Sequence, residues 1–200
     1  MLNLYVVPKC NNPVHLDSEK RTQVIVLLTS MGILGRASSK DEYGPGLEVS
    51  KLFHSDGLRH FCPGELTFES FKLESHQRSY FLPRNPALGM FDGTKCALCE
   101  DELEPQSLDL ALEKLSLFPV ASVRCECLSC CTDVPFAELS FVQNIAVAHT
   151  WLFFEGIAFG RLNPMVLEQL SKLIDFPLTL VNEVPEYSER SWDDAMGGPY

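Results

Sequence analysis

The pattern of apolar and polar residues in the first quarter of the chain predicts a strand, a helix and a loop. The apolar residues of "LNLYVVP" at 2–8 predict a short strand. Asp17 or Ser18 can cap a helix that is filled by "QVIVLLTSM", with Gly32 just past its end. The β-branched "VIV" run leaves a buried strand open as the alternative. The polar stretch "RASSKDEYGPGLE" that follows predicts a loop.

The second half of the chain predicts three helices and two short strands. A helix capped by Ser107 is expected to run to Phe118, and "ELSF" at 138–141 is expected to be a strand. The run "QNIAVAHTWLFFEGIAFG" carries apolar residues on nearly every face, which predicts a buried helix. Asn163 and Pro164 form a capping pair that opens the helix "MVLEQLSKLI", and "PLTLVNEV" predicts the final strand.

Proline and glycine residues divide the chain into two expected subdomains. The segment "FLPRNPALGMFDGT" holds two prolines and two glycines, which interrupt regular structure. We therefore expect an α+β fold with an N-terminal α+β subdomain at 1–82, a linker at 83–94 and a C-terminal subdomain at 95–185. The acidic tail at 186–200 lacks periodicity, so it is expected to be mobile or used for binding.

Six of the eight cysteines lie in residues 95–131, where they form two Cys-x-x-Cys motifs. Cys96 and Cys99 form the first motif, and Cys127 and Cys130 form the second. Two such turns supply the four thiolates of a tetrahedral zinc site, which is structural because no position is left for water. A helix between the motifs explains a separation longer than is usual for this pattern. The sequence predicts one structural Zn²⁺ in a zinc-ribbon-like subdomain, a knuckle pair with packed helices and short strands.

Other uses of these residue types remain open. Buried or oxidised thiols are the alternative to zinc, and Cys125 and Cys131 are near enough in sequence to compete as ligands. A redox role would place the first motif at the start of a helix after a strand, which "FDGTKCALCEDELEP" does not offer. A second metal site has two candidate groups: Cys10 with His15, and His54 with His60 and Cys62.

The charge balance indicates the kind of partner. The chain has 27 acidic residues against 16 basic ones, a formal net charge of −11. This excess argues against a broad basic face for nucleic acid or an anionic membrane, and favours a basic protein partner. The sequence shows no secretory signal and no apolar run long enough to span a bilayer, so a cytoplasmic protein is expected. The acidic residues expected to contact the partner are Asp41, Glu42 and Glu48, the group Glu100 to Glu104 beside the first motif, and Glu183, Glu186, Glu189, Asp193 and Asp194.

Familiar catalytic motifs are missing from the sequence. It has no phosphate-binding loop, no dinucleotide fingerprint, no Gly-x-Ser-x-Gly and no His-Glu-x-x-His. A zinc deaminase would need Pro-Cys-x-x-Cys after His-x-Glu, whereas Lys95 and Glu126 precede the two motifs here. We therefore predict a binding protein with no catalytic residues.

Residues 91–185 resemble a group of small bacterial zinc-ribbon proteins in the order of their motifs: Cys-x-x-Cys, helix, Cys-x-x-Cys, "PFAELSF", "WLFFEGI" and "NPMVLEQLSKLIDFPLTLV". In size, acidity and lack of catalytic motifs, the chain also resembles immunity proteins that protect bacteria from a secreted toxin, such as a type VI secretion nuclease. That resemblance implies a protein that occludes the toxin's catalytic domain.

Two competing hypotheses assign the cysteine region another role. The first is a zinc-ribbon adaptor in a nucleic-acid or transcription-linked complex. Such a ribbon is expected to expose basic residues, yet Lys95, Lys114 and Arg124 are outnumbered by acidic residues in this region. The second is a homo-oligomer or scaffold element that uses the aromatic run "TWLFFEGIAF". The oligomeric state stays open at this point.

Overall fold

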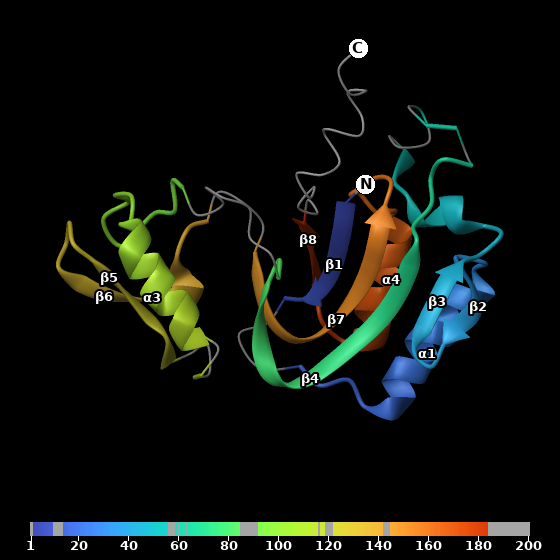
Figure 1. Cartoon of the computed structure of the whole chain (residues 1–200), viewed down its shortest axis with the longest axis horizontal. Coiled ribbons are helices and arrows are strands. Elements are labelled where there is room, and N and C mark those ends of the chain that lie inside the picture. The colour runs from blue at the N-terminus through green and yellow to red at the C-terminus, as the bar shows by residue number, and fades with distance from the viewer. Residues whose placement is uncertain are drawn as a thin grey trace, which may run out of the picture.

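The structure is a computed structural model with a mixed α+β fold (Figure 1). It describes residues 2–9, 14–55, 59, 61–62, 64–84, 92–115, 117–118, 122–141 and 145–183. The strands are β1 (Leu2–Pro8), β2 (Leu34–Ser39), β3 (Glu42–Pro45), β4 (Ser70–Leu82), β5 (Arg124–Cys127), β6 (Thr132–Pro135), β7 (Ala146–Ile157) and β8 (Leu178–Glu183). The helices are α1 (Ser18–Ser30), α3 (Pro105–Leu115) and α4 (Pro164–Ile174), with short 3-10 turns η1 (Val49–Leu52) and η3 (Phe136–Glu138). Within these ranges, no helix is long and apolar enough to cross a membrane.

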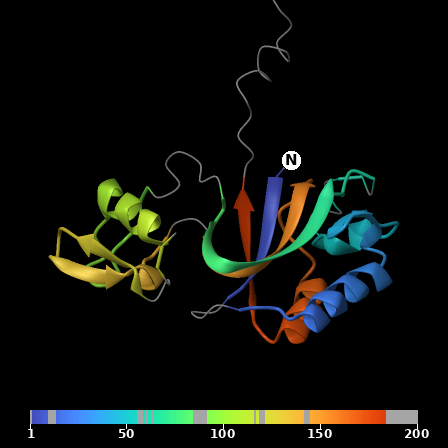
Figure 2. The ribbon, with the colours of Figure 1, turned by 60° about the horizontal axis from the view of Figure 1, so that its bottom comes forward.

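Six strands form one antiparallel sheet in the order β2-β3-β4-β7-β1-β8, and β5 pairs with β6 in a separate hairpin. Figure 2 shows α1 and α4 together on one face of the large sheet. The main core fills the space between them. It includes Val24 and Leu28 of α1 and Leu170 of α4, all fully buried.

Local sequence signals set the ends of α1 and α4 as predicted. Asp17 caps α1, because its carboxylate accepts a hydrogen bond from the Lys20 backbone N–H at 2.7 Å. Gly32 follows α1 with φ +73°, a conformation that glycine adopts without a steric penalty. Asn163 caps α4 by accepting from the Met165 N–H at 3.0 Å. The strands predicted from "LNLYVVP" and "PLTLVNEV" are confirmed as β1 and β8.

The loop predicted from "RASSKDEYGPGLE" is wrong, because this stretch forms the β2–β3 hairpin. Ser39 pairs with Glu42, so Lys40 and Asp41 make the turn. The hairpin lies at the edge of the sheet, where β2 is the outermost of the described strands and most of its side chains meet solvent. Polar residues are therefore compatible with a strand here, and they also discourage pairing with another chain.

The buried helix predicted from "QNIAVAHTWLFFEGIAFG" is also wrong, because residues 146–157 form β7. This strand lies inside the sheet between β4 and β1, and both of its faces are covered. Leu152 and Phe154 contribute to the main core, and Trp151 belongs to a smaller apolar cluster that includes Tyr5. A strand buried on both faces reads as a continuous apolar run, which periodicity alone does not distinguish from a buried helix.

Two smaller predictions in the second half also differ from the structure. The expected strand at 138–141 is the turn η3 followed by Ser140, which makes an isolated bridge to Lys95. The helix expected from Ser107 begins at Pro105 and ends at Leu115. Proline is well suited to the first turn of a helix because its missing N–H would have no helical partner there.

The large sheet joins parts of the chain that the sequence analysis placed in different subdomains. Strands β7 and β8, expected in the subdomain at 95–185, pair with β1 and β4 of the first subdomain. Residues 92–141, hereafter the cysteine subdomain, are thus inserted between two adjacent strands, β4 and β7. In both views this subdomain lies to one side of the sheet (Figures 1 and 2).

The cysteine subdomain has an apolar core of its own. Leu108, Ala111 and Leu115 of α3 are buried in it together with Val134 and other residues. Phe136 also belongs to this core, and its ring lies 6.4 Å from the Phe81 ring at the end of β4. This aromatic contact joins the insertion to the strand from which it departs.

Candidate metal centre

The first Cys-x-x-Cys motif folds as a tight turn just before α3. The Cys96 N–H donates to the Asp101 carbonyl at 2.9 Å, and the Glu100 N–H donates to the Cys96 carbonyl at 3.1 Å. The Leu98 N–H points at the Cys96 sulfur from 3.4 Å. Backbone amides directed at a sulfur favour its thiolate form, which is the form that binds metals.

The second motif lies at the tip of the β5–β6 hairpin. Cys127 is the last residue of β5, and Cys130 follows in the turn that leads to β6. The residues directly after the two motifs, Glu100 and Cys131, have φ values of +61° and +53°. Glycine is favoured in this left-handed region, so both knuckles adopt the usual backbone turn with a less favourable residue type.

The four sulfurs meet between the two turns. All of them lie within 4.8 Å of one another, and none is in a disulfide. The Cys96 and Cys130 sulfurs are 3.9 Å apart, and the Cys99 and Cys127 sulfurs are 3.6 Å apart. Each of these two pairs joins one turn to the other, so the sequence prediction that the motifs share one site is supported by their geometry. The cluster could hold one metal ion.

The thiols of the cluster differ in pKa, because backbone N–H groups, burial and neighbouring sulfurs act on them to different extents. The backbone N–H groups of Cys99 and Leu98 lower the pKa of the Cys96 thiol to about 7. At Cys99 the Asp101 N–H acts in the same direction, but burial and the neighbouring thiols outweigh it and raise the pKa of Cys99 to about 12. A cation placed among the four sulfurs would favour the thiolate form of each.

The two neighbouring cysteines lie outside the cluster. Cys125 points into the core of the cysteine subdomain, and burial raises the pKa of its thiol to about 11. Cys131 is exposed, and its sulfur faces the Leu128 carbonyl at 3.5 Å. Neither belongs to the group that could hold the metal ion. Of the candidates for a second site, Cys10 and His60 fall outside the described residues, so that hypothesis stays a prediction.

No family model, curated protein or solved structure matches this chain. The resemblance to zinc-ribbon and immunity proteins therefore stays a prediction.

The structure separates the acidic residues that were predicted to contact a partner. Asp41, Glu42 and Glu48 lie on or near the β2–β3 hairpin, which Figure 1 shows at the opposite end of the molecule from the cysteine subdomain. Glu42 and Glu48 form ion pairs with Lys72 and Lys51. The predicted contacts Glu186, Glu189, Asp193 and Asp194 fall outside the described residues.

Glu183 is buried, contrary to its predicted role as a surface acid. It is 3% exposed, and its carboxylate accepts hydrogen bonds from the Tyr5 hydroxyl at 2.6 Å and the Asn3 amide at 3.2 Å. A buried carboxylate is tolerated when such donors replace its hydration. Glu183 therefore stabilises the pairing of β8 with β1 instead of facing a partner.

We expect Tyr5→Phe to lower the free energy of unfolding by about 1–3 kcal/mol, because it removes a donor from a buried carboxylate. Burial and the bond to Glu183 raise the pKa of Tyr5. The unfolded chain therefore loses this proton before the folded one does, and stability falls as pH rises above about 10. Urea denaturation at neutral and alkaline pH measures both effects.

The matched control is Tyr43→Phe, which removes a hydroxyl from a half-buried tyrosine of β3. It should change stability by less than about 0.5 kcal/mol. Equal losses in the two variants would show that the Tyr5 hydroxyl has no special role.

The hairpin that carries the second motif also holds two acidic residues that were not among the predicted contacts. Glu126 of β5 and Asp133 of β6 are exposed and directly opposite each other in the pairing register. Like charges in this position destabilise a strand pair. The signal was present in the sequence, since "RCECLSCCTDVP" places one acid on each side of the second motif.

Proposed function

We propose that this protein is an acidic binding protein that neutralises a basic partner, and that its cysteine subdomain is the surface that binds. The observation that carries the proposal is the concentration of charge. Residues 92–141 hold ten of the 27 acidic residues but three of the 16 basic ones, so this quarter of the chain contributes −7 to a net charge of −11. Such a field speeds encounter with a cationic surface and selects against anionic ligands.

The opposed acids of the β5–β6 hairpin support the same surface. Glu126 and Asp133 lie opposite each other on the exposed face of the strand pair, and Arg124 of the same hairpin donates to the Asp133 carbonyl at 3.3 Å. A lysine or arginine of a partner could bind between the two carboxylates, because close charge pairs across an interface strengthen binding.

Zinc is the metal we propose for the four thiolates. Four soft thiolates in a tetrahedral arrangement suit zinc, and a Zn–S bond of about 2.3 Å places tetrahedral sulfurs about 3.8 Å apart. The sulfur separations of 3.6 Å between Cys99 and Cys127 and 3.9 Å between Cys96 and Cys130 lie on either side of this value. With four protein ligands the ion has no open position, so its role is to hold the hairpin and the first turn together. The proposed function is therefore binding and not catalysis.

An immunity protein for a toxin nuclease is the form of this function that we favour. A nuclease must present a basic cleft to bind phosphates, and an acidic module can cover that cleft. The metal fixes the shape of the acidic surface before binding, which reduces the ordering cost of association. In this proposal the protein acts in the cytoplasm and blocks the toxin by occlusion.

The first experiment identifies the partner and then tests the hairpin. The full chain is used as bait in a lysate of the source organism, and each recovered protein is purified and its affinity measured directly. The double variant Glu126→Gln, Asp133→Asn should bind the partner at least about tenfold more weakly, as for close charge pairs at interfaces. Its stability should stay within about 0.5 kcal/mol of the parent, because both side chains are exposed.

The matched control is Glu19→Gln, Glu168→Gln, which removes the same charge from exposed positions on α1 and α4. We expect its affinity for the partner to stay within about twofold of the parent's, because exposed charges remote from the interface contribute little to binding. Equal weakening by the two variants would refute the hairpin surface. Recovery of nucleic acid in place of a basic protein would favour the adaptor hypothesis and contradict the inhibitor.

A further inference from the structure

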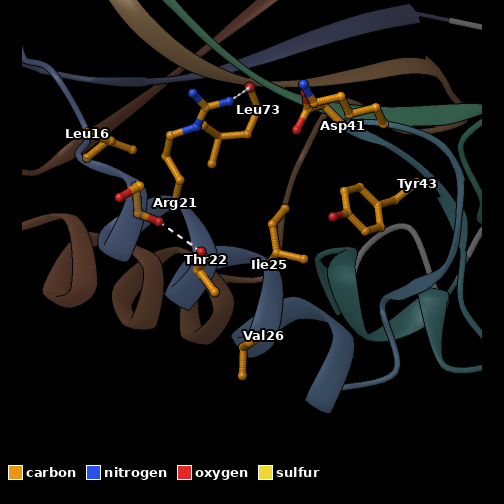
Figure 3. Close-up of a pocket in the computed structure, with 10 residues that line it drawn as sticks. Leu16, Arg21, Thr22, Ile25, Val26, Asp41, Tyr43 and Leu73 are labelled. Carbon is orange, nitrogen blue, oxygen red and sulfur yellow. Dashed lines mark hydrogen bonds between the residues drawn. The ribbon is translucent and has the colours of Figure 1, made fainter.

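A groove on the helix-covered side of the sheet is separate from the cysteine centre and has a volume of about 500 Å³. Figure 3 shows α1 on one side of it and the turn of the β2–β3 hairpin on the other. Leu16 and Leu73 form apolar parts of its lining, and both are buried. The volume lies within the range of small-molecule sites, roughly 300–1,000 Å³.

The apolar lining explains the "VIV" run of α1. The helix contributes Val24 and Leu28 to the main core, and these are its buried residues. Ile25 packs partly against the main core and also lines the groove together with Val26, which is 59% exposed. Val26 is thus an apolar side chain that the core does not bury, and it lies where a ligand with an apolar body would contact it.

Three charged residues line the same groove: Arg21 of α1, and Lys40 and Asp41 of the hairpin turn. Arg21 is anchored, because its guanidinium donates to the Leu73 carbonyl at 3.2 Å. In Figure 3 the Asp41 carboxylate faces the groove across from the Arg21 guanidinium. Within the part of the chain that the structure describes, none of the three forms an ion pair.

Opposite charges that face one groove without pairing match a ligand that carries both charges itself. A carboxylate fits the guanidinium fork of Arg21 and the ammonium of Lys40, and an ammonium group fits Asp41. The Tyr43 ring and the apolar residues fit an aromatic or aliphatic body. We propose that this groove binds a small zwitterion with an apolar body, of which an aromatic amino acid is the simplest example.

The backbone of the hairpin turn places Asp41 in this position. Asp41 has φ +111°, outside the region that most residues adopt, and its N–H bonds to the Ser39 carbonyl at 3.1 Å. Asparagine and aspartate tolerate positive φ better than other non-glycine residues. Asp41→Asn therefore removes the charge while it keeps the turn.

The test compares three probes that share a phenyl ring: L-phenylalanine, 3-phenylpropanoate without the amine, and 2-phenylethylamine without the carboxylate. Binding to the ¹⁵N-labelled full chain is followed by NMR, using the backbone amides of residues 18–26 and 39–43. Phenylalanine should bind at least about fivefold more tightly than either analogue, which is the effect of one partly exposed charge pair. Equal affinity for the three probes, or no saturation by phenylalanine up to its solubility limit, would overturn the proposal.

Two variants assign the charges. In Asp41→Asn, phenylalanine and 3-phenylpropanoate should bind with about equal affinity. In Lys40→Gln, the ratio between the affinities of phenylalanine and 2-phenylethylamine should become smaller. Because each readout is a ratio between two probes on the same protein, a general change in folding does not imitate it. Lys51→Gln is the control, since this residue lies on η1 and pairs with Glu48. A ratio that is unchanged in Asp41→Asn would exclude the ammonium contact.

Discussion

Replacing Cys127 with serine is expected to release the proposed zinc and to unfold the cysteine subdomain while the six-stranded sheet stays folded. Cys127 is fully buried, and its sulfur lies 3.6 Å from that of Cys99. A serine hydroxyl is a poor ligand for zinc, and binding energy at such a site is folding energy. The free energy of unfolding of the cysteine subdomain should fall by about 3 kcal/mol or more. Elemental analysis measures the metal, and hydrogen exchange over residues 92–141 measures the unfolding.

Cys131→Ser is the closest control for this change. Cys131 lies four residues further along the chain, is exposed and stands outside the four-sulfur cluster. This variant should keep its metal and change stability by less than about 0.5 kcal/mol. Metal binding should also weaken in acid, because protons compete for the thiolates. A Cys127→Ser protein that folds normally without metal would refute a structural role for the site.

The second large effect is expected from Phe154→Ala in β7. Phe154 is fully buried, and its ring lies 5.3 Å from that of Phe68 and 4.9 Å from that of Phe71. Truncation removes apolar surface from the main core and leaves a cavity between the sheet and its helices. The free energy of unfolding should fall by about 3–5 kcal/mol, as measured by urea denaturation.

Leu47→Ala serves as the control for apolar truncation, because Leu47 is fully exposed near the β2–β3 hairpin. Its effect should stay within about 0.5 kcal/mol. If Phe154→Ala cost less than about 1 kcal/mol, the core between the sheet and its helices would be less tightly packed than the ring contacts indicate.

Features that depend on a few neighbouring residues were predictable from the sequence. The caps Asp17 and Asn163 each accept a hydrogen bond from a backbone N–H no more than three residues further along the chain, so the local sequence is enough to predict them. The same holds for the two Cys-x-x-Cys motifs, whose internal spacing defines the turn that presents the sulfurs. This explains why the mixed α+β fold and the four-cysteine cluster were expected before the structure.

Features that depend on distant neighbours could not be predicted in this way. Strand β7 is apolar on both faces because apolar clusters cover both of them while β4 and β1 pair with its edges, and none of these contacts is visible in its own sequence. The burial of Glu183 depends on Tyr5, which lies near the other end of the chain. The groove likewise joins Arg21 with Asp41 from separate elements, so the spacing of these residues gave no signal.

The hydrogen bonds between Lys95 and Ser140 decide how strongly metal loss would be felt in the sheet. These residues bond to each other in both directions, at 2.9 Å and 3.1 Å, near the two ends of the cysteine subdomain. While the subdomain is folded, these bonds therefore shorten the loop that must be closed when Leu82 of β4 pairs with Ala146 of β7, and they lower the entropy cost of closing it. Unfolding turns all of residues 83–145 into the loop, which costs the β4–β7 pairing only about 1 kcal/mol because closure entropy grows with the logarithm of length. The sheet is thus largely insulated from the metal state of its insertion.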